Sequence, residues 1–131
     1  MSTSGGRAPI RILLIEDEAA IARVTSILLQ NEGYDVEAVS DLGAALPLLA
    51  EKSFELVIAD TQHGARTTDL SGLAPLVAGA GARPVLLFSA HRFSATQIDA
   101  AGLAGAIRKP YDVDDLLQTI ERTLREHGAA P

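Results

Sequence analysis

The stretch FELVIAD, residues 54–60, is an almost unbroken apolar run that ends at one carboxylate, Asp60. Two other runs, IRILLI at 10–15 and RPVLLF at 83–88, have the same character. Near-continuous apolar runs of this length are typical of parallel strands, because helices cover both faces of a parallel sheet. We therefore predict three buried strands, at 10–15, 54–59 and 83–88.

Two weaker runs complete the predicted strands. YDVEAV at 34–39 is expected nearer an edge of the sheet, and AGAIR at 104–108 is rich in alanine and glycine, which are poor strand formers. Helical patterns separate the five runs. Five helices are predicted: after the acids at 16–18 up to Gly33, from Asp41 to about Lys52, at 71–81, at 94–102, and from Asp112 onward.

Two details of these helices can be compared with a structure. Apolar residues of the first helix recur at helical spacing and are predicted to face the core: Ile21, Val24, Leu28 and Leu29. Pro47 lies inside the second predicted helix, where a proline removes a hydrogen bond. That helix would tolerate Pro47 best if its first turn began later than Asp41.

Strand and helix alternate five times along the chain, which is the pattern of a parallel α/β sheet with helices on both faces. Right-handed crossovers leave few topologies, and five strands favour a flavodoxin-like (βα)5 doubly wound parallel sheet with strand order 2-1-3-4-5. The predicted organisation is one domain at 10–127, between a flexible N-terminal tail at 1–9 and a C-terminal tail at 128–131.

The composition agrees with one domain and argues against several classes of protein. The chain has 131 residues, 47% of them apolar, and no cysteine, so disulfides and thiolate metal sites are excluded. It has no apolar run of the ~18 residues that span a membrane and no signal-peptide pattern, so we expect a cytoplasmic protein. The formal charge of −6 is unfavourable for nucleic acid, which needs a basic surface.

Polar residues follow the predicted strands at one end of the sheet. In open parallel sheets this carboxyl edge is where ligands bind, at the point where the strand order reverses. The residues expected to converge there are Glu16, Asp17 and Glu18 after the first strand, Asp60 after the third, Ser89 after the fourth and Lys109 after the fifth.

This set of residues indicates phosphoryl chemistry. Carboxylates packed together repel one another unless a cation or a proton compensates them, and a site of oxygen ligands without histidine or cysteine suits Mg²⁺. A lysine and a hydroxyl add two groups that can hold anionic oxygen. We therefore interpret Asp60 as a nucleophile that attacks phosphorus and becomes an aspartyl phosphate.

Each residue alone also has an ordinary structural explanation. Acids at a helix start complement the helix dipole, and a single aspartate after a strand commonly belongs to a turn. The placement of all of them at the same strand end favours the functional interpretation.

The segments ILLIEDEAAIARVTSILLQNEGYDVEAVSDLGAAL, FELVIAD, PVLLFSA and IRKPYDVDDLLQTI together resemble the receiver domain of bacterial two-component response regulators. The resemblance covers about residues 10–126. It implies that Asp60 is the phosphoacceptor, and that a histidine kinase or histidine phosphotransferase protein is the phosphoryl donor.

The resemblance also assigns roles to the other residues of the site. Asp17 would bind Mg²⁺ directly, Glu16 through water, and Gln62 through its backbone carbonyl. Ser89 would contact the phosphoryl group through its hydroxyl, and Lys109 would pair with the phosphate. The Lys109-Pro110 peptide bond is usually cis in the family.

Three departures from the family pattern are visible in the sequence. Ala106 occupies the switch position where the family usually has Tyr or Phe, so the usual coupling of an aromatic rotamer to the hydroxyl residue cannot operate. The loop after Asp60 is longer, and it carries His63 and Arg66. The segment between Ser89 and Lys109 is shorter, so the helix at 94–102 is expected to be short or irregular.

His63, Arg66 and His91 are candidate modulators of the phosphoryl lifetime, since they could shield the anion or position the hydrolytic water. For either histidine, a solvated loop residue is the favoured alternative.

The expected function is a single-domain receiver that works as a phosphorylation-controlled protein switch or a phosphorelay intermediate. It would not be an enzyme beyond its own phosphorylation and dephosphorylation. Its output partner, or a second copy in a homodimer, would bind the surface of the helix at 94–102, the strand at 104–108 and the last helix. Arg108, Tyr111 and Leu117 belong to that surface. A domain excised from a longer protein remains an alternative.

Three other functions compete with this one. A degenerate receiver would act as a constitutive interaction module without phosphate, which Ala106 favours and the complete acid, hydroxyl and lysine set opposes. An aspartate-nucleophile phosphohydrolase usually has a second aspartate two residues after the nucleophile, where this chain has Gln62. A nucleotide-binding protein would need a glycine-rich loop after the first strand.

Overall fold

The computed structural model describes residues 9–60 and 70–127, and the strands and helices alternate there as predicted. The strands are β1 (Arg11–Ile15), β2 (Asp35–Val39), β3 (Leu56–Asp60), β4 (Val85–Ser89) and β5 (Gly105–Arg108). The helices are α1 (Ala19–Asn31), α2 (Leu42–Glu51), α3 (Ala74–Ala80), α4 (Ala95–Ala100) and α5 (Val113–Glu126), with a 3-10 helix at Leu70–Leu73 before α3. The predicted tails fall almost entirely outside the described residues.

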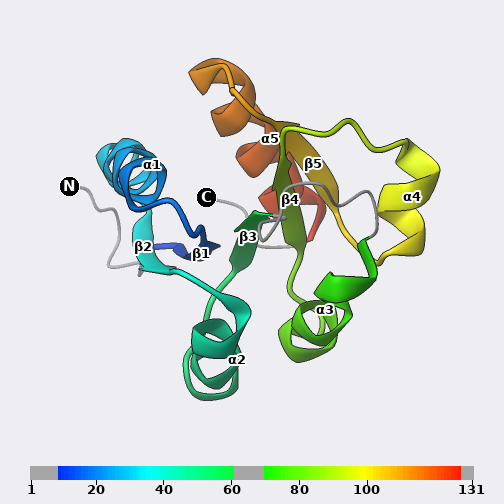
Figure 1. Cartoon of the computed structure of the whole chain (residues 1–131). Helices are drawn as coiled ribbons and strands as arrows, with labels where there is room; N and C mark the ends of the chain where they lie inside the picture. The colour runs from blue at the N-terminus through cyan, green and yellow to red at the C-terminus, as the bar shows by residue number, and fades with distance from the viewer. Residues whose placement is uncertain (1–8, 61–69, 128–131) are drawn as a thin grey trace.

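The five strands form one parallel sheet in the order β2-β1-β3-β4-β5, which confirms the predicted flavodoxin-like topology (Figure 1). Every residue of β3 and β4 is buried, as expected for strands covered on both faces. The edge strands β2 and β5 keep exposed residues. The weaker strand signals in the sequence therefore belong to the two edges of the sheet.

Apolar side chains form a separate cluster on each face of the sheet. Successive side chains of a strand point to opposite faces, so Leu13 and Ile15 join one cluster while Ile12 and Leu14 join the other. Helices α2, α3 and α4 cover the first cluster, and α1 and α5 cover the second (Figure 1). Each fully buried leucine or isoleucine contributes about 1.5–3 kcal/mol to this core.

The strands β3 and β4 begin two residues later than the predicted runs and include their terminal polar residues. Asp60 is the last residue of β3 and lies level with Phe88 of β4, and Ser89 is the last residue of β4 and lies level with Arg108 of β5. Both polar groups are thereby held at the carboxyl edge by the strand pairing itself.

The predicted core face of α1 is wrong at Val24. Val24 is 58% exposed, whereas Thr25 and Leu29 are fully buried. Residues four apart share one face of a helix, and in α1 that face is turned toward the sheet. A threonine therefore occupies a core position, and its buried hydroxyl requires a hydrogen-bond partner.

Helix α2 begins directly after Asp41, whose Oδ1 accepts a hydrogen bond from Ala44 N at 2.9 Å. This start confirms the helix predicted from the Asp41 cap, and Pro47 lies inside the helix without a later first turn. The proline has no N–H to donate to the carbonyl one turn earlier. The aspartate cap and the buried side chains of Ala45 and Leu49 hold the helix despite this lost bond.

The helices on the β4 side are short. The helix predicted at 71–81 is divided between the 3-10 helix and α3, and the helix predicted at 94–102 is reduced to the six residues of α4, as the short segment there led us to expect. Ser94 and Gln97 cap α4 reciprocally, side chain to backbone. Among the described residues, no helix has the length and apolar character that a membrane crossing needs.

Candidate functional site at the carboxyl edge of the sheet

Lys109 joins two buried carboxylates at the carboxyl edge of the sheet. Its Nζ donates a hydrogen bond to Glu16 Oε1 at 2.9 Å and lies 3.3 Å from Asp60 Oδ2. Glu16 follows β1, Asp60 ends β3, and Lys109 follows β5, so the contact brings together three elements that are distant in the sequence. The structure thus brings these three predicted residues together.

Asp17 completes a cluster of three acids. Carboxylate oxygens of Glu16, Asp17 and Asp60 all lie within 4.8 Å of one another. Glu16 is 2% exposed and Asp60 8% exposed, whereas Asp17 is open to solvent. The cluster therefore has a buried floor and one exposed acid at its mouth.

Burial and the hydrogen bond between Glu16 and Lys109 act in opposite directions on the pKa of each of these two residues. Burial raises the pKa of Glu16 above its ordinary value; the hydrogen bond from Lys109 opposes this rise, and the neighbouring Asp60 adds to it. For Lys109, burial acts to lower the pKa, but the hydrogen bond with Glu16 and the charge of Asp60 outweigh it, so that its pKa is raised. Glu16 and Asp60 thus stabilise the charged form of Lys109, and the single ammonium leaves part of the negative charge of the acids uncompensated.

The donor atoms of this cluster fit a magnesium ion. They are carboxylate oxygens from Glu16, Asp17 and Asp60, which are the hard ligands that Mg²⁺ prefers. The exposed position of Asp17 leaves room for the water ligands that Mg²⁺ retains. Because one lysine compensates only part of the charge of three acids, a divalent cation would relieve their remaining repulsion.

Ser89 lies buried at the end of β4, with its hydroxyl engaged locally. Its Oγ accepts a hydrogen bond from His91 N at 2.9 Å and donates one to His91 O at 3.0 Å. The imidazole of His91 is exposed and packs edge-on against Phe93, with ring centroids 4.6 Å apart. The proposed influence of His91 on phosphoryl lifetime stays a prediction.

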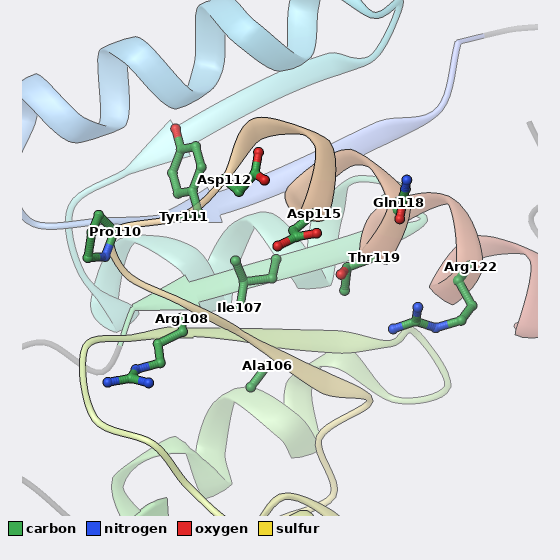
Figure 2. A pocket seen from close by; sticks show the side chains of 10 residues that line it. All are labelled: Ala106, Ile107, Arg108, Pro110, Tyr111, Asp112, Asp115, Gln118, Thr119 and Arg122. Atoms are coloured by element: carbon green, nitrogen blue, oxygen red, sulfur yellow. The ribbon is translucent and has the colours of Figure 1, made fainter.

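Ala106 and Arg108 are exposed on one side of β5, and Ile107 is buried on the other (Figure 2). They border a groove of about 410 Å³ between β5 and α5. Only a methyl group stands at the predicted switch position, so no aromatic ring of residue 106 can change rotamer there. The Lys109-Pro110 peptide bond is cis, as the resemblance implied.

Three predicted residues lie outside the described part of the chain. They are Gln62, the expected backbone ligand of the metal, and the candidate modulators His63 and Arg66. Their roles remain predictions from the sequence.

The sequence predicts no role at the site for Thr25 or Phe88, and it places Tyr111 only on a partner surface. In the structure Tyr111 OH lies 3.0 Å from Thr25 Oγ1, and its ring stacks on Phe88. Thr25 lies four residues after Ile21 within the apolar pattern of the first helix, and this spacing is the signal that could have identified it.

Comparison with known proteins agrees with the family resemblance seen in the sequence and with the fold. Residues 12–121 match the family model for the response regulator receiver domain. The transcriptional regulatory protein ZraR of Salmonella typhimurium is 33% identical over 131 residues, covering 94% of this chain and 29% of its own length. The alginate biosynthesis transcriptional regulatory protein AlgB of Pseudomonas putida is 35% identical over 108 residues, covering 81% and 24%.

A solved structure agrees over its full length. The chemotaxis protein CheY4 of Vibrio cholerae is 25% identical with a TM-score of 0.77, covering 89% of this chain and all of that one. The chain spans less than a third of the two curated relatives, whose names describe transcriptional regulators. The prediction that the acidic domain itself does not bind nucleic acid is therefore still to be tested.

Proposed function

The chain belongs to the response regulator receiver domain family, and on this premise we propose that it accepts a phosphoryl group on Asp60 and works as a phosphorylation-controlled protein switch. The donor would be the phosphohistidine of a histidine kinase or of a histidine phosphotransferase protein. The cytoplasmic location expected from the sequence belongs to the same proposal.

The proposed reaction transfers one phosphoryl group between side chains. A carboxylate oxygen of Asp60 forms a bond to phosphorus while the bond between phosphorus and the donor's imidazole nitrogen breaks, and that nitrogen leaves with the electron pair. The product on Asp60 is an acyl phosphate. The protein would return to its starting state by hydrolysis of this bond, so its chemistry acts only on itself.

The residues around Asp60 would stabilise the added charge. Lys109 Nζ, already 3.3 Å from Asp60 Oδ2, can donate to a phosphoryl oxygen, and Ser89 can do so by exchanging its hydrogen bond to His91 O. Glu16, Asp17 and Asp60 would hold Mg²⁺, which when bound neutralises charge on the phosphoryl oxygens.

The single observation that carries the proposal is the position of the Lys109 ammonium, which contacts the carboxylates of both Glu16 and Asp60. A partly buried cation beside a buried aspartate at the carboxyl edge of a parallel sheet is prepared for a group that becomes more negative when it reacts. The output partner would bind the surface of α4, β5 and α5, where Arg108 is exposed beside the groove. A second copy of the chain would use the same surface to form a homodimer.

The test is incubation of the purified chain with acetyl phosphate and Mg²⁺, followed by intact-mass measurement. We expect one additional phosphoryl group per molecule, and its removal by hydroxylamine, which cleaves acyl phosphates. The alternative function, a degenerate receiver that binds partners constitutively, predicts no adduct under any concentration of Mg²⁺. Ala106 favours that alternative, and the presence of an adduct would eliminate it.

Mg²⁺ is expected to raise the melting temperature more at about pH 7.5 than at about pH 5. The ion needs ionised carboxylates, and burial holds the pKa of Glu16 above its ordinary value of 4.5. As the pH falls through this raised pKa, a proton occupies the oxygen that the ion would use, so the stabilisation by Mg²⁺ is lost. Thermal unfolding with Mg²⁺ or with chelator at both pH values measures the difference.

The matched control for this measurement is Glu16→Gln. Without the carboxylate of Glu16, the rise in melting temperature caused by Mg²⁺ should be smaller at the higher pH. This rise should also differ less between the two pH values. Equal increments at both pH values in the unsubstituted protein would contradict the assignment of Glu16 to the ion site.

A further inference from the structure

We propose that Tyr111 is a positioning residue for Lys109, held in place by the buried hydroxyl of Thr25 on α1 and by the ring of Phe88 on β4. The inference deepens the proposed function, and its kinetic part rests on that function. Figure 2 shows the Tyr111 side chain rising from the segment after β5 toward the blue helix α1.

Thr25 directs its hydroxyl to Tyr111 and not to its own helix. Its Oγ1 lies 3.0 Å from Tyr111 OH, across 86 positions of sequence, and the residue is fully buried. A buried threonine in a helix commonly donates to the carbonyl four residues earlier, as Thr123 of α5 does to Thr119 O at 2.7 Å. The contrast between the two threonines indicates that the Thr25 hydroxyl fastens α1 to the segment after β5.

Phe88 is contacted by two residues of that same segment. The ring of Tyr111 stacks on it at 5.6 Å between centroids with 24° between the planes, and Lys109 Nζ lies 5.8 Å from its centroid. Phe88 also lies level with Asp60 in the sheet. The ring on which Tyr111 rests is therefore the one over which the ammonium of Lys109 lies.

The position of the Lys109 ammonium depends on such contacts. Its backbone is fixed by the hydrogen bond from Lys109 N to Ser89 O at 2.9 Å, but the four-carbon stem beyond it rotates freely unless its surroundings confine it. Helix α1 begins two residues after Asp17. By joining Tyr111 to α1, the hydroxyl pair ties the segment that carries Lys109 to the segment that carries Glu16 and Asp17.

Acetylation of lysine amines tests this positioning without any phosphoryl transfer. The chain has two lysines, Lys52 and Lys109, whose side chains are 41% and 18% exposed, so Lys52 serves as an internal reference. In Tyr111→Phe and in Thr25→Val, we expect acetylation of Lys109 relative to Lys52 to become about three- to tenfold faster, the range for losing one hydrogen bond. Peptide mass spectrometry after a short exposure to acetic anhydride measures the ratio.

The same variants test the kinetic consequence. The rate of Asp60 phosphorylation by acetyl phosphate should fall by about three- to tenfold in each of them. Thr25→Ser, which keeps the hydroxyl, should restore both the rate and the protection of Lys109. The double variant Tyr111→Phe/Thr25→Val should be little worse than either single variant, because both remove one shared hydrogen bond.

Two controls remove a hydroxyl elsewhere in the same face of the core. Tyr34→Phe removes the other tyrosine hydroxyl, and Thr123→Val removes the other buried helical threonine hydroxyl of the described residues. Both should leave the Lys109 ratio and the phosphorylation rate unchanged, whatever they do to the melting temperature.

The outcomes separate the two proposals. If the unsubstituted protein takes up no phosphoryl group, the proposed function fails, and the acetylation ratio alone still decides the positioning role. If Tyr111→Phe lowers the melting temperature but leaves the Lys109 ratio unchanged, the hydroxyl pair is purely structural and the inference is overturned. The inference is overturned as well if the controls change the ratio as much as Tyr111→Phe does.

Discussion

Asp60→Asn is expected to abolish the phosphoryl adduct completely. Only a carboxylate oxygen at this position can form the acyl phosphate, because the amide of asparagine is a far weaker nucleophile of nearly the same shape. The substitution also removes one of the two carboxylates that share Lys109 Nζ, while Glu16 keeps its hydrogen bond at 2.9 Å. The fold should therefore be retained, and the loss of the adduct should not reflect unfolding.

Intact mass after treatment with acetyl phosphate and Mg²⁺ measures this effect. The matched control is Asp99→Asn, the same chemical change at an exposed position of α4, which should leave the adduct at its full level. An adduct of equal amount in Asp60→Asn would place the phosphoryl group on another residue and would contradict the mechanism.

Lys109→Met is expected to lower the free energy of unfolding by about 3 kcal/mol at neutral pH in the absence of divalent cations. Methionine keeps the apolar stem but leaves Glu16 and Asp60 without their shared ammonium, and both carboxylates are buried. Removing one partner of a buried ion pair costs the full desolvation of the charges left behind. Urea unfolding with chelator present measures the loss.

Two conditions should reduce this deficit. Mg²⁺ should restore part of the stability, because it supplies positive charge to the same acids. Lowering the pH should also reduce the deficit. Burial already raises the pKa of Glu16, and without Lys109 this pKa should rise further. As the pH falls, Glu16 then takes up a proton and its uncompensated charge disappears.

Lys52→Met is the control for this second prediction. Lys52 Nζ lies 3.0 Å from Glu37 Oε1 on the surface, where an ion pair contributes about 1 kcal/mol or less. The free energy of unfolding of Lys52→Met should therefore fall only slightly, and this fall should not change when Mg²⁺ is added. A Lys109→Met protein as stable as Lys52→Met, with no response to Mg²⁺, would contradict the view that Lys109 compensates the buried acids.

Much of the architecture was predictable from local patterns. The apolar runs placed β1, β3 and β4 inside a parallel sheet, and the topology and the edge position of β2 followed from right-handed crossovers and burial. The error in α1 arose because the apolar pattern allowed two orientations of the helix. Val24 and Thr25 are adjacent, and only packing against the sheet decided that the threonine faces inward and the valine faces solvent.

The sequence by itself determined which polar residues meet, because parallel strands bring the residues that follow them to one edge: Glu16, Asp60 and Lys109 were predictable for this reason. Only the tertiary structure decided how they share their contacts, with one ammonium between two buried carboxylates. It also decided that Thr25 bonds to Tyr111, a residue 86 positions away. Local periodicity fixes the face of a helix or strand, whereas such pairings depend on the distances and angles at which whole elements pack.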